Sequence, residues 1–351
     1  MKKSKKSSAV SWQSLCLIIL CLFLGIVLVT LIAATAYFNH LLSFVTHNNN
    51  SDIDGTLSPD VLATATDDDY NGDFTGPSTD HGDIVLSTLP TLTPDEMIVE
   101  GVYNIMLIGE DRRPGEDRQR SDSMILCSFN TNSNSIDMIS FLRDTYVAIP
   151  GHNANKMNAA YQIGGVSLLD QTMALNYGVH VDANIVVNFE GFKSIIDMLG
   201  GVDITLTAAE ADHLNGRYGY ELSAGKQHLD GEQALNYSRI RKIDWDINRT
   251  QRQRNVLTAL LNSFKNKNIT EMVSIATNIL QSGYIQTDMS ADEIRGYIIT
   301  LFPMLSSADV TNQHIPALDT FSEMSIGTLT YCKVPDLEAN RKILKEIFEA
   351  T

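Results

Sequence analysis

The chain has 351 residues and carries a formal net charge of -16 at neutral pH. Its hydrophobic fraction of 44% and its charged fraction of 19% are typical of a globular protein and exclude a largely disordered chain. A nucleic-acid backbone would be repelled by so acidic a protein everywhere except at a local basic patch. We therefore expect no nucleic-acid partner.

The N-terminal region predicts a membrane anchor. Lysines at positions 2, 3, 5 and 6 precede an uncharged apolar run from Leu15 to Phe38, which is long enough to cross a bilayer as a helix. Lysines before the run and none directly after it place the N-terminus in the cytoplasm and the later domain outside the cell, on a single-pass membrane protein. A cleaved signal peptide ending near Ala34-Thr35-Ala36 is the alternative, but the run is longer than the apolar core of such a signal.

Composition divides the rest of the chain. Residues 39–97 are rich in Asp, Ser, Thr, Gly and Asn and contain neither Lys nor Arg, which indicates a flexible acidic stalk. We therefore predict a basic cytoplasmic tail (1–11), a transmembrane anchor (12–38), the stalk (39–97) and a folded domain (98–351). Cys127 and Cys332 are predicted to be buried free thiols, with one disulfide as the alternative for an exported domain.

The folded domain begins with a compact apolar run over 104–109, which predicts a buried strand, followed by the polar loop 110–122. Strands are predicted over 123–129 and 136–143, joined by a turn. Helices over 156–161 and 166–176 follow, with Gly178 near the stop. A strand over 181–189, a helix over 191–199 and a strand over 201–206 complete this half.

The second half is less regular. The segment 208–231 is polar and rich in glycine, which predicts a surface excursion. Helices are predicted over 272–280 and 291–301, and an amphipathic last helix contains Leu337, Arg341, Leu344 and Phe348. The alternation of strands and helices predicts the fold class: α/β, a layered α-β-α extracytoplasmic domain with a central, mostly buried sheet, preceded by one transmembrane helix.

A short basic stretch reverses the acidic character of the chain. Between Arg239 and Arg254 the sequence contains six Lys and Arg residues. An extended backbone over 237–241 would send Arg239 and Arg241 to one face and Ile240 to the other. We predict such a strand, with two guanidinium groups pointing the same way.

A helix is predicted to start at Asn248, which can cap it, with Gln251 reaching back. The apolar stripe of this helix, over 256–264, continues backward to Gln253 and Arg249, which places both against the interior. Inward arginines require an anion, and guanidinium groups match phosphate oxygens bidentately. The stretch therefore predicts a phosphate or pyrophosphate site, with a solvated basic face as the alternative.

The loop 110–122 offers a second site. Asp111 and Asp122 stand at its two ends, and carboxylates gathered in this way can hold Mg²⁺, or Mn²⁺ in its place, together with phosphate oxygens. A metal ion beside an arginine cradle suits phosphoryl transfer. The alternative is a set of surface salt bridges. Motifs for nucleotide loops, zinc proteases and serine hydrolases are missing from the sequence.

The sequence resembles the LytR-CpsA-Psr family of cell-wall glycopolymer transferases over about residues 103–264. Seven segments carry the resemblance in the family's order, each of them moderately specific. These segments are Asn104–Arg112, Arg120–Leu126, Arg143–Tyr146, Lys156–Tyr161, Gly200–Asp203, Tyr237–Arg241 and Arg249–Gln253.

The resemblance implies a membrane protein whose external domain moves a polyprenyl-pyrophosphate-linked glycopolymer, of teichoic acid or capsule type, onto a peptidoglycan hydroxyl. By motif, Asp111 and Asp122 would hold the metal and, with Arg143, form the catalytic set. The residues implied to bind the pyrophosphate are Arg120, Arg143, Arg239, Arg241, Arg249 and Gln253. The apolar faces behind them would take the lipid tail.

Two positions depart from the family pattern: Leu142 replaces the usual Pro, and Asn248 replaces the usual Gly. The general base stays open among Asp122, Asp144 and Asp246. Two other functions are compatible with the same residues. One is a pyrophosphatase that hydrolyses the lipid-linked donor, and the other is a membrane-anchored binding or signalling module for lipid-linked wall polymer.

Overall fold

The computed structural model describes residues 40, 46–47, 96–110, 118–241, 243–265, 271, 274–275, 278–279 and 281–350. The predicted tail and anchor, most of the predicted stalk, and Asp111 lie outside these residues. Among the described residues, no helix combines the length and the apolar character needed to cross a bilayer. The fold described below is that of residues 45–351.

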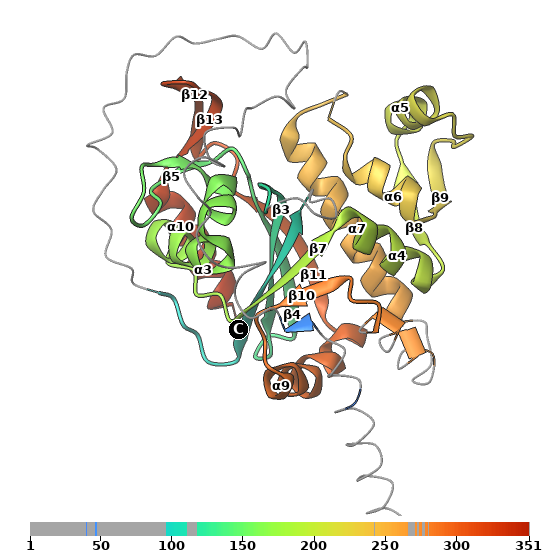
Figure 1. Cartoon of the computed structure of the whole chain (residues 1–351), viewed down its shortest axis with the longest axis horizontal. Coiled ribbons are helices and arrows are strands. Elements are labelled where there is room, and N and C mark those ends of the chain that lie inside the picture. The colour runs from blue at the N-terminus through green and yellow to red at the C-terminus, as the bar shows by residue number, and fades with distance from the viewer. Residues whose placement is uncertain are drawn as a thin grey trace, which may run out of the picture. The chain divides into compact units, whose positions relative to one another are not determined.

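A mixed seven-stranded sheet forms the centre of the domain (Figure 1). Its order is β1 (Thr46–His47), β10 (Ile285–Thr287), β7 (Ala183–Asn188), β2 (Val102–Glu110), β3 (Ser121–Asn130), β4 (Ser135–Phe141) and β11 (Asp309–Ile315). The pairs β1–β10, β7–β2 and β4–β11 are parallel, whereas the other neighbours are antiparallel. The predicted strands β2, β3, β4 and β7, and the α/β class with a central sheet, are confirmed.

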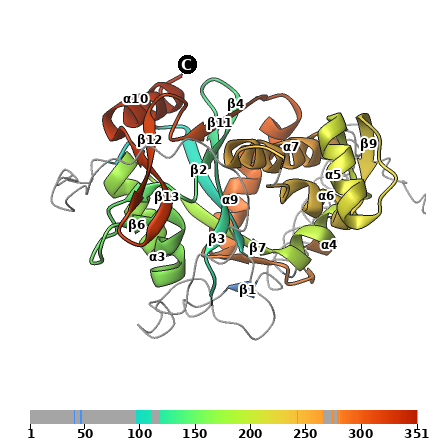
Figure 2. The ribbon, with the colours of Figure 1, turned by 90° about the horizontal axis from the view of Figure 1, so that it is seen from above.

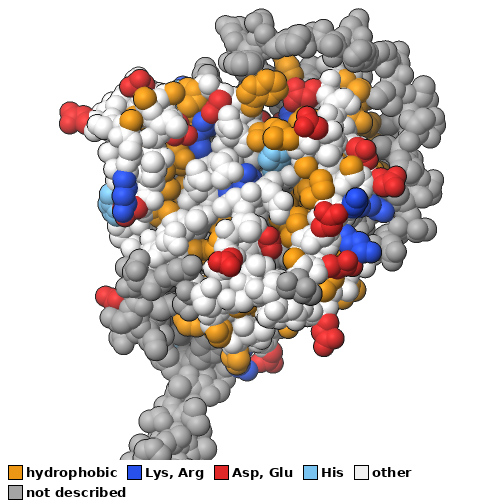
Figure 3. Space-filling model, turned by 180° about the vertical axis from the view of Figure 1, so that it is seen from behind, with side chains coloured by type: hydrophobic (Ala, Val, Ile, Leu, Met, Phe, Trp, Pro, Cys, Tyr) orange, Lys and Arg blue, Asp and Glu red, His pale blue; other side chains and the backbone are white. Residues whose placement is uncertain are grey.

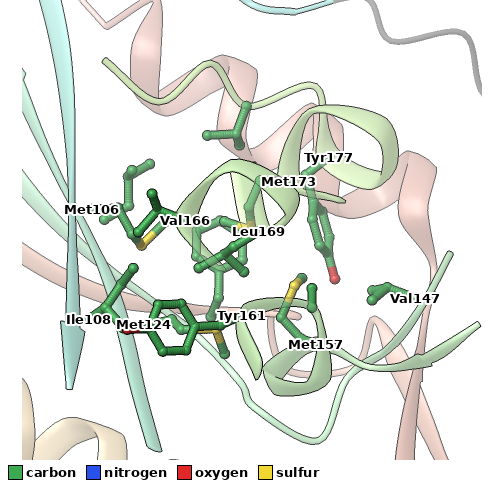
Figure 4. Packing of buried hydrophobic residues seen from close by; sticks show 14 of the residues in the cluster. Met106, Ile108, Met124, Val147, Met157, Tyr161, Val166, Leu169, Met173 and Tyr177 are labelled. Carbon is green, nitrogen blue, oxygen red and sulfur yellow. The ribbon is translucent and has the colours of Figure 1, made fainter. Parts of the chain in front are cut away.

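One face of the sheet is covered by α3 (Met157–Tyr177) and α10 (Leu337–Phe348). Figure 4 shows the apolar packing there, in which Met106 and Ile108 of β2 lie beside Val166 of α3. The helix α3 leaves helical geometry at Gly164 and Gly165, which accounts for the two separate helices expected from the sequence. It ends at Gly178, whose positive φ of 68° suits glycine.

The other face is covered by α7 (Asp246–Lys265), α9 (Ala291–Leu301) and the short 3₁₀ helix η2 (Phe302–Ser306). Here Ile125 of β3 and Met138 of β4 pack against Leu257 of α7. The predicted helix over 291–301 is confirmed with the same bounds. A capping box formed by Ser290 and Glu293 starts it.

A third layer lies outside α7 (Figure 2). It consists of α4 (Phe189–Leu199), α5 (Ala208–Tyr218), α6 (Gly231–Ser238) and the hairpin of β8 (Val202–Leu206) and β9 (Gly225–Leu229). These elements share a core with Val256 of α7. The segment 208–231 lies mostly at the surface, as predicted, but it has regular structure, since a capping box of Thr207 and Glu210 starts α5 and β9 pairs with β8.

Two further hairpins complete the domain. The first is β5 (Tyr146–Val147) with β6 (Asn155–Lys156), and the second is β12 (Phe321–Ile326) with β13 (Leu329–Pro335). A backbone bridge between Thr145 and Lys333 joins the second hairpin to the segment after β4. Cys127 and Cys332 are buried and do not form a disulfide with each other, as predicted.

Candidate functional site

Polar side chains gather at one edge of the sheet, where β2 ends, β3 begins and β4 ends. Gly109 pairs with Ser123 and Glu110 pairs with Ser121, so Asp122 is the extra residue of a β-bulge. A Cβ atom on Gly109 would lie 3.1 Å from the Cβ of Ser123, so this close approach favours glycine. The bulge places Asp122 outside the regular alternation of β3.

The Asp122 carboxylate joins two arginines that are far apart in the sequence. Arg143, two residues beyond β4, donates from Nη1 to Asp122 Oδ1 at 2.8 Å. Arg241 donates from Nη2 to Asp122 Oδ2 at 3.2 Å. The structure thus brings three of the predicted site residues together.

The segment 237–241 is not the predicted strand. The helix α6 runs to Ser238 after a capping box of Asp230 and Gln233, and Arg239 ends it. Arg239 is exposed and its guanidinium lies 4.3 Å from the centre of the Phe189 ring, while Arg241 turns toward Asp122. Arg239 and Arg241 therefore do not lie on one face of a strand. The alternation of charged and apolar residues over 237–241 falls at the end of a helix.

The helix α7 brings the next part of the site. Arg249, only 2% exposed, pairs through Nε with Asp246 Oδ1 at 2.7 Å. Gln253 Oε1 accepts a hydrogen bond from Ser123 Oγ at 3.1 Å. The inward position of Arg249 is confirmed. The predicted Asn248 cap is wrong, since α7 begins at Asp246.

The charges of this group, here called the arginine cluster (Asp122, Arg143, Arg241, Asp246 and Arg249), perturb one another. Burial would raise the pKa of Asp122, but Arg143, Arg249 and Arg241 together hold it below its ordinary value. The pKa of Asp246 is likewise lowered against the effect of burial, chiefly by Arg249 and Arg143. Burial, with Arg249 and Arg143 nearby, lowers the pKa of Arg241 to about 10.

The opposite balance holds at Arg143, whose pKa rises because Asp144, Asp246 and Asp122 outweigh burial. The arginine cluster therefore contains three guanidinium groups and two carboxylates. The buried Nε atom of Arg143 lies 3.5 Å from Asp144 Oδ2, and that of Arg249 lies 2.7 Å from Asp246 Oδ1, so both face carboxylates. Among the described residues, the carboxylates that contact these guanidinium groups are therefore those of Asp122, Asp144 and Asp246.

Several residues around the arginine cluster were not singled out by the sequence analysis. Lys156 pairs with Asp144 at 3.0 Å, and the buried Lys333 pairs with Glu323 at 2.9 Å. The backbone N–H of Lys333 donates to the Asp144 carbonyl. Lys156 lies in a recognised motif and could have been found, whereas Lys333 of β13 could not be placed here without the fold.

At the end of β2, the buried Glu110 accepts hydrogen bonds from the Gln119 backbone and from the Tyr161 hydroxyl. Arg120 donates from Nε to Gln162 Oε1 of α3 at 3.3 Å. The departure at Leu142 has a structural reason, because its N–H donates to the carbonyl of Ile315, a bond that the proline usual in the family could not make.

Of the two predicted metal ligands, only Asp122 lies in the part of the chain that the structure describes. Within that part, no three metal-ligating side chains form a cluster. Both Asp122 oxygens accept from arginines, but each carboxylate oxygen has a further lone pair. Asp122 thus fits a Mg²⁺ ion that is bound by one or two carboxylates and by substrate oxygens.

One outer face of the domain has a different distribution of basic side chains from this edge of the sheet. In the face shown in Figure 3, blue side chains of the described residues form no continuous basic area.

Comparisons with known proteins agree with this architecture. A model of the LytR_cpsA_psr family matches residues 87–346. The polyisoprenyl-teichoic acid–peptidoglycan teichoic acid transferase TagU of Oceanobacillus iheyensis is 38% identical over 248 residues, which cover 68% of this chain and 73% of TagU.

Two solved structures share the fold. TagV of B. subtilis is 29% identical, with a TM-score of 0.58, over 72% of this chain and 100% of TagV. The family protein YwtF (TagT) with a bound octaprenyl pyrophosphate lipid is 24% identical, with a TM-score of 0.55, over 78% of this chain and 98% of that protein. With the family model matching more than half of its length, this chain belongs to the LytR-CpsA-Psr family.

Proposed function

We propose that this protein transfers a polyisoprenyl-linked teichoic acid glycopolymer to peptidoglycan at the outer face of the membrane. The transferase class follows from the relative TagU, whose name states this activity. The observation that carries the substrate chemistry is the concentration of positive charge at the arginine cluster: among the described residues, Arg143, Arg241, Arg249 and the neighbouring Lys156 pair with three carboxylates, those of Asp122, Asp144 and Asp246. A pyrophosphate between lipid and glycan would balance this excess charge.

In the proposed reaction, an acceptor hydroxyl of peptidoglycan attacks the phosphorus that carries the glycan. A new P–O bond forms, the bond to polyprenyl phosphate breaks, and the hydroxyl proton is released. The arginines bind the pyrophosphate and stabilise the charge that develops on it. The lowered pKa values of Asp122 and Asp246 suit carboxylates that orient arginines, and make both weak proton acceptors.

A metal ion remains part of this proposal. Asp122 and Asp111 would hold Mg²⁺, which would supply further neutralisation of the pyrophosphate charge. For the lipid tail, we propose the apolar side of α7, where Leu257, Leu260 and Leu261 are only half-buried and follow Gln253 along the helix.

Transfer is tested with the purified full chain, a labelled polyprenyl-pyrophosphate glycan and peptidoglycan. Product that forms only with peptidoglycan present supports the proposal. Release of labelled glycan at the same rate without it would show a pyrophosphatase. Binding of the donor without any turnover, with and without Mg²⁺, would show a binding module.

A simpler test measures melting temperature with inorganic pyrophosphate. Binding to the folded state alone would stabilise the protein by about 2.7 kcal/mol at a ligand concentration a hundred times the Kd. The Arg241→Ala, Arg249→Ala variant should show a much smaller shift. An unchanged melting temperature of the wild type would contradict an anion site in the arginine cluster.

A further inference from the structure

A second buried arginine on α7 differs from those of the arginine cluster. Arg254 is 1% exposed, and no carboxylate among the described residues contacts it. Burial lowers its pKa to about 10, and no neighbouring charge adds to this shift. A buried charge without a counter-charge is costly, so stability alone does not explain an arginine here.

The neutral partners of Arg254 belong to two different elements. Its Nη1 donates to Ser140 Oγ of β4 at 2.5 Å, and its Nη2 donates to Gln251 Oε1 of α7 at 2.7 Å. Gln251 Nε2 donates in turn to Asn255 Oδ1 at 2.9 Å, and Asn255 Nδ2 donates to the Tyr237 hydroxyl of α6 at 3.1 Å. One continuous network, here called the buried relay, thus joins β4, α7 and α6.

The arginines of the proposed pyrophosphate site lie on these three elements or directly beyond their ends. Arg143 follows Ser140 beyond the end of β4, Arg249 lies on α7, and Arg241 follows Tyr237 beyond the end of α6. The buried relay therefore fixes the relative placement of all three segments. Supporting hydrogen bonds of this kind hold binding groups in a productive geometry.

We infer that Arg254 is a positioning residue for the pyrophosphate site, and that through the buried relay it holds Arg143, Arg249 and Arg241 in one constellation. Only a guanidinium can bridge Ser140 and Gln251 simultaneously with parallel donors, whereas a lysine offers a single point charge. The inference rests on the proposed function, because it concerns the alignment of that anion site.

The test compares the Kd for inorganic pyrophosphate with the melting temperature of the empty protein, using the full chain. Arg254→Met removes both the bridge and the uncompensated charge. We expect its Kd to rise about tenfold, as for other supporting residues, while its melting temperature stays equal or rises. Arg254→Lys should also bind weakly, because it keeps the charge but not the bridge.

The Ser140→Ala variant tests the same bridge with a milder change. Its effect on the Kd should not add to that of Arg254→Met in the double variant, because both remove one connection. Thr258→Val is the matched control: Thr258 also joins α7 to β4, contacting Met138 Sδ at 3.9 Å, but lies outside the buried relay. We expect its Kd to stay within about twofold of the wild type, because substitutions that remove no essential contact usually have small effects.

The outcomes separate this inference from the proposed function. If the wild type does not bind pyrophosphate, the proposed function fails first. If the wild type binds and Arg254→Met binds equally well, only the inference is overturned. Full recovery by Arg254→Lys, or full additivity with Ser140→Ala, would also overturn it. If Arg254→Met does not fold, an unchanged Kd in Ser140→Ala overturns it.

Discussion

The helices α3 and α7 pack on opposite faces of the same sheet, yet they bury different chemistry. In α3 the buried surface is mainly apolar, with Tyr161, Leu169 and Met173 in one continuous core. In the first half of α7, three arginines are buried, namely Arg249, Arg252 and Arg254. The first face provides stability in the ordinary way, by removing apolar surface from water. The second face buries charge, which stabilises only where each charge has a partner.

The three α7 arginines also differ from one another. Arg252 donates to Glu210 and Asp244 and is fully balanced by carboxylates. Arg249 pairs with Asp246, whose pKa Arg143 also helps to lower, and the partners of Arg254 among the described residues are neutral. The three positions therefore differ in role: Arg249 belongs to the proposed anion site, Arg252 pairs with carboxylates inside the fold, and Arg254 connects α7 to β4. Substitutions on α3 and at the arginines of α7 should show whether the residues that stabilise the fold differ from those that bind the anion.

The largest effect on stability is expected at Arg252. Arg252→Met would leave the buried Glu210 and the half-buried Asp244 without this partner, so the free energy of unfolding should fall by about 3 kcal/mol or more. Urea denaturation measures it, with Arg252→Lys as the control that keeps the charge. A loss below about 1 kcal/mol would place Arg252 among ordinary surface pairs.

A comparable but somewhat smaller loss is expected on the α3 face. Leu169 is completely buried, and Leu169→Ala should cost about 3 kcal/mol through lost burial and the cavity left behind. Its Kd for pyrophosphate should equal that of the wild type at a temperature where both are folded. Weakened binding would show that the two faces are not independent.

Within the arginine cluster, substitution of Arg249 should weaken pyrophosphate binding and also lower stability, because Asp246 loses its partner. Arg249→Ala removes a buried charged donor, so the free energy of pyrophosphate binding should become less favourable by about 1.5 to 3 kcal/mol. Arg239→Ala should have a smaller effect, because Arg239 is exposed and stacked on Phe189. Isothermal calorimetry of both variants checks the order, and equal losses would argue against the assigned geometry.

The smallest change is expected from pH near neutrality. Asp246 has a folded-state pKa below that of the unfolded chain, about 3.9. It therefore stabilises the fold at all pH values above about 3.9, and this contribution is lost only as the pH falls toward the folded-state value. The stability difference between wild type and Asp246→Asn should be constant from about pH 5 to 8 and shrink below about pH 4. A difference that shrinks near pH 6 would contradict the lowered pKa.

The strands β2, β3, β4 and β7 could be predicted from the sequence, because each is a short apolar run bounded by turn residues. The inward position of Arg249 followed from the apolar stripe of α7. Both predictions rest on the pattern of apolar residues along a short segment, and the same residues are buried in the folded domain.

Other parts depend on contacts that local patterns do not contain. The capping boxes at Thr207 and Asp230 were signals for α5 and α6 that the sequence analysis did not use. The burial of Arg252 could not be foreseen, because it requires α5 to bring Glu210 against a second side of α7. The same holds for Lys333, which reaches the arginine cluster only through the hairpin β12–β13.

The bulge at Asp122 makes the site sensitive to chain length. Deleting one residue between Ser121 and Ser123 would restore a regular ladder with β2, so the sheet itself would accept the change. Ser121 would still pair with Glu110, but the carboxylate of Asp122, which joins Arg143 to Arg241, would be lost. Among relatives, a gap at this position should therefore be rare, even though the fold could absorb it.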